Sequence, residues 1–117
     1  MDLNKITQTF KEHPEYHKMG MIASHLGVVR ENSLSGKMVS EIEVRFEKKI
    51  IDDIIRDIKN MKGIIHVMVE YSEGRLSVGD EIMAVVVGGD TRKHVFPALI
   101  EAVDRIKKEG GKKKEIF

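Results

Sequence analysis

The sequence predicts an α+β protein in which helices pack on a mixed sheet and the elements follow the order α-β-β-α-β-β-α. Two observations predict this class. Some segments repeat apolar residues at helical spacing while others alternate or run continuously apolar, and a helix separates the two pairs of predicted strands. No repeat or linker divides the 117 residues, so we expect a single domain over residues 1–117.

The first third of the chain predicts one helix and one strand. Residues 3–12 carry apolar side chains on one helical stripe, Asp2 is a suitable N-cap, and the pair His13-Pro14 ends the helix. Residues 19–30 are largely apolar and predict a strand, in which Gly27 indicates a bulge or a close backbone approach.

The middle of the chain contains the clearest patterns. Residues 31–37, ENSLSGK, are rich in loop formers, and residues 38–46 then alternate between apolar and polar, as a strand with one wet face does. Residues 48–62 carry an isoleucine-rich stripe at helical spacing and predict a helix, with Gly63 as its C-cap.

The last half predicts two more strands, a helix and an extended tail. Residues 64–71 form a strand, residues 72–80 resemble a turn, and the continuously apolar residues 82–87 predict a strand covered on both faces. Residues 95–106 repeat apolar positions on one helical side, and residues 107–117 follow as an extended segment.

Composition excludes several classes of protein. Twenty basic and nineteen acidic side chains nearly cancel, aromatic residues are few, and no stretch is long and apolar enough for a signal peptide or membrane span. We therefore expect a cytoplasmic protein that binds neither nucleic acid nor membrane. The absence of cysteine excludes disulfides, thiolate metal sites and cysteine nucleophiles, so any sulfur must come from another molecule. The five histidines lack metal-ligand spacing, and we predict no metal and no cofactor.

A cluster of lysines surrounds the pair Gly110-Gly111 near the C-terminus. Its members are Lys107, Lys108, Lys112, Lys113 and Lys114. Five ammonium groups suit a phosphate or another anion, and a desolvated lysine could act as an acid, base or nucleophile. The alternative interpretation is a solvated tail whose charges suit the C-terminal end of a helix dipole.

Two arginines mark further candidate anion sites. Arg92 follows Gly-Gly-Asp-Thr at a predicted helix start, where backbone N–H groups already favour anions. The alternative is that Asp90 or Thr91 simply caps this helix. Arg30 lies at a strand end beside a loop, where a surface charge is the alternative interpretation.

The stretch EGRLSVGDEIMAVVVGGDTRKHVFPALIEAVDRIKK and the tail after it resemble a known family. Its members share a G-x-L-x-x-G-[DE] turn, an apolar strand, a helix opening near an arginine, a lysine late in that helix and a tail ending W-K-K-E or similar. Upstream, GVVRENSLSGKMVSEIEVRF is similar to that family's arginine-containing loop and alternating strand. The whole chain thus resembles the large, catalytic subunit of molybdopterin synthase.

This resemblance implies a molybdopterin synthase large-subunit-like fold and a sulfurtransferase activity in molybdenum and tungsten cofactor assembly. The family forms a homodimer with two small, ubiquitin-like subunits, whose C-terminal Gly-Gly ends as a thiocarboxylate. Sulfur passes from that thiocarboxylate to cyclic pyranopterin monophosphate and forms the dithiolene of molybdopterin. The lack of cysteine fits this chemistry, because the partner carries the sulfur.

The resemblance also implies roles for individual residues. Lys107 matches the catalytic lysine at the helix end, and Lys113 matches the first lysine of the tail motif, with Lys114 as a possible substitute. Arg92 and Arg30 match arginines expected to bind the substrate's phosphate. Lys107 would assist proton transfer or stabilise the intermediate, and Lys113 would hold the small subunit's terminus or an oxyanion.

Two departures from the family pattern keep other functions open. Thr91 stands where the family has a histidine, and Lys112 stands where its tail has a tryptophan. His94, one turn later, is a conceivable replacement for the lost imidazole. A non-catalytic homologue that binds a ubiquitin-like sulfur carrier is therefore the alternative function. A nucleic-acid binder using the lysine tail is a third interpretation.

Overall fold

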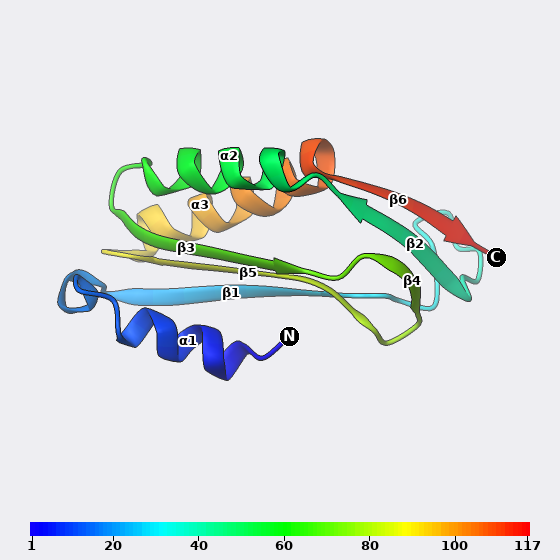
Figure 1. The fold of residues 1–117 in the computed structure, drawn as a ribbon, viewed down its shortest axis with the longest axis horizontal. Helices are drawn as coiled ribbons and strands as arrows, with labels where there is room; N and C mark the ends of the chain where they lie inside the picture. The colour runs from blue at the N-terminus through cyan, green and yellow to red at the C-terminus, as the bar shows by residue number, and fades with distance from the viewer.

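Three helices and six strands make up the chain, and the computed structural model describes all 117 residues (Figure 1). In order they are α1 (Leu3–Lys11), β1 (Met21–Val28), β2 (Glu41–Phe46), α2 (Lys48–Lys59), β3 (Ile64–Tyr71), β4 (Gly74–Ser77), β5 (Glu81–Gly89), α3 (Arg92–Arg105) and β6 (Gly111–Ile116). A short 3-10 helix at Tyr16–Lys18 follows α1, and a single π-helical turn at Ile106–Gly110 ends α3. The predicted α+β class is confirmed.

The prediction of a single mixed sheet is wrong. The strands form two three-stranded sheets, ordered β1-β5-β3 and β4-β2-β6, and every pairing in them is antiparallel. Two strands account for the difference: β4 forms within the segment predicted as a turn, and β6 forms from the tail. Both pair with β2, so β2 belongs to a second sheet. Apolar periodicity reveals that a strand exists, but it does not reveal which edge the strand joins.

The central strand of the first sheet is β5, which is buried on both faces as predicted. Residues 83–89 are all buried, and β1 and β3 pair with β5 on either side. The register between β1 and β5 shifts between Gly27 and Val28, which confirms the predicted irregularity at Gly27.

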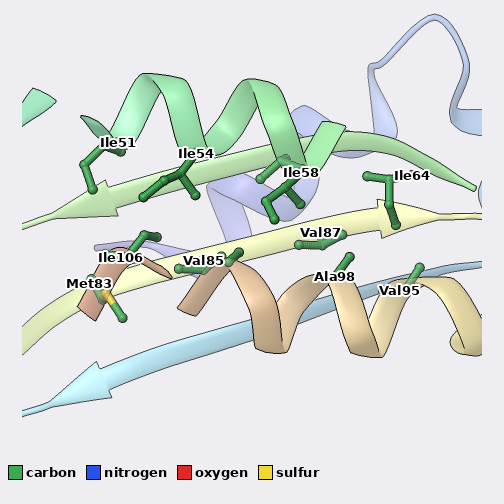
Figure 2. Packing of buried hydrophobic residues seen from close by; sticks show 12 residues of the cluster. Ile51, Ile54, Ile58, Ile64, Met83, Val85, Val87, Val95, Ala98 and Ile106 are labelled. Atoms are coloured by element: carbon green, nitrogen blue, oxygen red, sulfur yellow. The ribbon is translucent and has the colours of Figure 1, made fainter. Parts of the chain in front are cut away.

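Helices cover both faces of this sheet and form two core clusters. On one face α2 and α3 bury an aliphatic cluster against β5, with Ile54, Val85 and Ala98 among its members (Figure 2). On the other face α1 covers the sheet (Figure 1), and its Phe10 belongs to a second cluster with Val86 of β5. Neighbouring residues of a strand face opposite sides, so β5 serves both clusters in turn.

The helix ends follow the sequence in part. The Asp2 carboxylate caps α1 by accepting hydrogen bonds from the backbone N–H groups of Asn4 (2.9 Å) and Lys5 (3.2 Å), as predicted. In contrast, α2 ends earlier than predicted. Its C-cap is Asn60, and Gly63 occupies the following turn with a φ of 78°.

The second sheet lies beside the C-terminal end of α3, at one end of the molecule (Figure 1). Gly110 and Gly111 connect α3 to strand β6 of this sheet, and they lie close to α2 and β2. A Cβ atom on Gly110 would lie 2.7 Å from Cδ1 of Ile51, and one on Gly111 would lie 2.8 Å from Cε1 of Phe46. A larger residue at either position would therefore force one of these side chains to move.

No helix of the structure is both long enough and apolar enough to cross a lipid bilayer.

His66 of β3 is a polar residue within the apolar packing beneath α1. Its ring lies 4.9 Å from the Phe10 ring and 4.8 Å from the His13 ring, centroid to centroid, and its Nδ1 atom is buried without a hydrogen-bond partner. Burial lowers the pKa of His66 from its ordinary value, and the nearby Lys59 and His13 lower this pKa further. Folding therefore favours the neutral form of this imidazole.

We predict that Ile54→Ala lowers the free energy of unfolding by about 2–5 kcal/mol, because it leaves a cavity in the larger core cluster. Ile54 is only 1% exposed. Leu34, which is 93% exposed, provides the control: Leu34→Ala should change the free energy by no more than about 0.5 kcal/mol. Urea denaturation measures both, and equal losses would contradict this description of the core.

The lowered pKa of His66 predicts a pH-dependent stability. Because the unfolded chain binds a proton at this histidine more readily than the folded chain, the free energy of unfolding should decrease as the pH falls through the ordinary value of 6.5. His66→Phe should remove part of this decrease. Denaturant unfolding of both proteins at about pH 7.5 and about pH 5.5 measures the decrease. If the difference in unfolding free energy between the two pH values is the same in His66→Phe as in the wild type, His66 is not its source.

Candidate functional site

A cavity of about 590 Å³ opens where the two sheets meet, a volume typical of small-molecule sites. Its apolar wall includes Val29, Val39, Ile42 and Val44, which form a separate small core cluster between the end of β1 and strand β2. Basic side chains from three separate segments also line the cavity. It therefore combines an apolar wall with cationic groups.

Lys107 reaches this cavity from the π-helical turn that ends α3. The preceding residue, Ile106, is fully buried against the main core, whereas Lys107 is exposed and lines the cavity. A π-turn accommodates one extra residue and changes the direction of the following side chains, and such turns are frequent at functional sites. The next lysine, Lys108, does not line the cavity.

Lys113 reaches the same cavity because β6 pairs with β2. Val44 of β2 stands opposite Lys113, and Lys112 and Glu115 also line the cavity. Lys114 does not line it; this residue stands opposite the exposed Glu43. The geometry thus distinguishes Lys113 from Lys114, which the sequence left unranked.

Arg30 lines the cavity just beyond β1. Its neighbour Val29 is buried and is fixed by two backbone hydrogen bonds, in which Val29 N–H donates to Asp80 (2.9 Å) and Gly79 N–H donates to the Val29 carbonyl (2.8 Å). The turn before β5 thereby holds the base of Arg30 in place. Three of the predicted residues, Arg30, Lys107 and Lys113, share one cavity.

Arg92 lies outside this cavity. It is the first residue of α3, and the 14 residues of that helix place it about 20 Å from Lys107, at the opposite end. Close to Arg92, the Asp90 carboxylate accepts hydrogen bonds from the Thr91 backbone N–H (2.6 Å) and pairs with Nδ1 of His94 (2.7 Å). The His94 contact lowers the pKa of Asp90. Within one chain, Arg92 does not join the other predicted residues.

His25 of β1 lines the cavity and was missed by the sequence analysis. Its Nε2 atom is buried without a hydrogen-bond partner. Burial lowers the pKa of His25, and the positive charge of Lys107 lowers this pKa further. Spacing between histidines indicates metal ligands only, and His25 has no partner at such a spacing. The informative signal is a histidine within a largely apolar predicted strand, three residues before Val28.

The arrangement suits an anionic ligand with an apolar portion. Guanidinium and ammonium groups bind phosphate or carboxylate, while the valine and isoleucine wall excludes water from the rest of the ligand. Glu115 is the one acidic residue of the lining. No group of three His, Asp or Glu side chains is arranged to hold a metal ion.

Comparison with known proteins identifies relatives of the chain. A family model described as MoaE protein matches residues 1–109. No curated protein sequence matches.

Solved structures share the fold over nearly the whole chain. A molybdopterin synthase from Staphylococcus aureus is 24% identical, with a TM-score of 0.77 over 95% of this chain and 84% of the other. Molybdopterin cofactor biosynthesis protein E from Burkholderia multivorans is 23% identical, with a TM-score of 0.78 over 100% of this chain and 77% of the other.

A third similar structure, from Helicobacter pylori, is a protein–protein complex of subunits 1 and 2 of molybdopterin-converting factor. It is 14% identical, with a TM-score of 0.73 over 98% of this chain and 78% of the other. At these identities the structures establish the fold, and the family model establishes the relationship. The resemblance found in the sequence is thereby confirmed, and the chain belongs to the MoaE protein family.

Proposed function

We propose that this chain is the catalytic subunit of a molybdopterin synthase, which transfers sulfur from a small-subunit thiocarboxylate to cyclic pyranopterin monophosphate. The observation that carries this proposal is that Arg30, Lys107 and Lys113 line one cavity although they come from three separate segments. Membership of the MoaE family supports the same function.

Each of the three residues has a role suited to its chemistry. The guanidinium of Arg30 binds the phosphate of the substrate, because its planar fork matches phosphate oxygens. Lys107 assists proton transfer or stabilises the intermediate during attack by the thiocarboxylate. Lys113 holds the small subunit's terminus or stabilises a developing oxyanion.

The sulfur donor in this proposal is a small, ubiquitin-like subunit with a C-terminal Gly-Gly thiocarboxylate. A separate donor is required because the chain has no cysteine of its own. The similar Helicobacter pylori structure is a complex of two subunits, which supports a partner of this kind. The internal Gly110-Gly111 pair serves close packing in this chain.

Arg92 can bind the substrate in this proposal only at the cavity of a second copy of the chain. The length of α3 separates it from Lys107 of its own chain by about 20 Å, so it cannot bind a phosphate held beside that lysine. In a homodimer, Arg92 of one protomer would serve the cavity of its partner. Lys114 has no such place in the cavity, and Lys113 is the preferred tail residue.

A binding protein without catalytic activity is the second candidate function. Thr91 replaces the family's histidine, and Lys112, which lines the cavity, replaces its tryptophan. Such a protein would bind the small subunit without completing sulfur transfer.

Reconstitution distinguishes these two functions. We expect the protein, its small partner as the C-terminal thiocarboxylate and cyclic pyranopterin monophosphate to yield the dithiolene product. Lys107→Ala should lower the rate by roughly 100-fold or more, because it removes a positioned acid–base group. Product formation is followed after its oxidation to a fluorescent pterin.

Lys108→Ala is the matched control, because Lys108 is adjacent to Lys107 but lies outside the cavity. It should retain the wild-type rate. Partner binding without product would identify the non-catalytic alternative. Equal losses in the two lysine variants would contradict the assignment of Lys107.

A further inference from the structure

His25 occupies an unusual position between two hollows of the surface. It lines the main cavity, and it also lines a smaller one of about 240 Å³ formed with α3, whose other residues include Leu99 and Asp104. Its strand neighbour across the sheet is the fully buried Val85. The imidazole therefore stands at the boundary between the core and the proposed site.

The Nε2 atom of His25 has no partner in the protein. A Cβ atom on Gly27 would lie 3.5 Å from this nitrogen, so the absence of a side chain at Gly27 leaves the nitrogen uncrowded on that side. Buried polar atoms of folded proteins are nearly always hydrogen-bonded, and each exception calls for an explanation such as strain, a catalytic role, or a bound water, ion or ligand. A ligand in the cavity would supply the missing partner.

Comparison with His66 separates this explanation from simple core packing. Both histidines lie in the first sheet, and both have a buried ring nitrogen without a partner. The His66 ring packs on the rings of Phe10 and His13, whereas no aromatic ring packs on His25. His66 is also absent from the cavity that His25 lines. Only His25 combines an unpartnered nitrogen with a place beside Lys107.

We propose that His25 is a substrate-contacting residue of this cavity, whose imidazole hydrogen-bonds the heterocyclic ring of the bound pterin while the basic residues hold its phosphate. This role rests on the proposed function and extends it to recognition of the ring. Pterin edges carry both N–H donors and carbonyl or ring-nitrogen acceptors, and a neutral imidazole offers one donor and one acceptor.

The charge state of His25 agrees with this role. Burial and the Lys107 ammonium both keep its pKa below the ordinary value of 6.5, so the imidazole is neutral at neutral pH. Arg30 and Lys113 already provide positive charge for the phosphate. A neutral imidazole adds a directional hydrogen bond without increasing repulsion among these cations. It can therefore discriminate between ligands that carry the same phosphate.

The test replaces the imidazole by a ring of similar size that cannot form hydrogen bonds. His25→Phe should weaken binding of cyclic pyranopterin monophosphate, measured by calorimetry, by roughly 10-fold or more, because the ring loses a buried hydrogen bond. In the reconstituted reaction, kcat/KM should fall by a similar factor. His66→Phe, the matched control in β3 at the other edge of the same sheet, should change neither quantity beyond about 2-fold.

A measurement on the wild-type protein keeps this test independent of how the variants fold. In nitrogen-15 NMR, adding cyclic pyranopterin monophosphate should shift the imidazole resonances of His25 and leave those of His66 in place. Two results would overturn this inference and leave the proposed function intact, provided that the wild-type protein forms product. The first is that the His25 resonances do not shift. The second is that His25→Phe and His66→Phe have equal pterin affinity and equal kcat/KM. A wild-type protein that binds the pterin but forms no product rejects the proposed function alone. Absence of pterin binding rejects both.

Discussion

The antiparallel pairing of β2 with β6 is the contact on which the candidate site depends. It joins residues 41–46 to residues 111–116, and hydrogen bonds from Glu47 N–H to the Gly110 carbonyl and from Ser40 N–H to the Ile116 carbonyl lie at its two ends, each 2.9 Å long. Without this pairing, the lysines after α3 would form the solvated tail that the sequence also allowed. With it, Lys113 becomes part of a cavity wall.

The two sheets position different residues of the candidate site. The first sheet is covered on both faces by helices and holds the large core. It also fixes the position of His25, on β1, and of Arg30, just beyond the end of β1. The second sheet supplies a smaller apolar wall and Lys113. Lys107 lies at the junction, where Ile106 packs into the large core and the π-turn directs the chain toward β6. The cavity is lined by residues of both sheets and of this junction.

Local features of the fold could be predicted from sequence, whereas long-range pairing could not. Alternation in residues 38–46 revealed a strand, but its partner β6 lies some 70 residues away, and lysine-rich sequence carries little strand signal. For the same reason Lys113 and Lys114 could not be ranked, since only the register with β2 separates them. The position of Arg92 was available in principle, because a helix of 14 residues cannot bring its two ends together. His25 was missed because an isolated histidine in an apolar strand has no motif.

The most direct test of the central claim is to locate where the small subunit's C-terminus meets this chain. A small subunit whose Gly-Gly terminus is converted to an amine-reactive ester would acylate the nearest lysine, and mass spectrometry of the digested conjugate would identify it. We expect acylation at Lys107 or Lys113, because both lysines line the proposed site. Acylation spread evenly over Lys108, Lys114 and other surface lysines, or concentrated far from the cavity, would contradict the account.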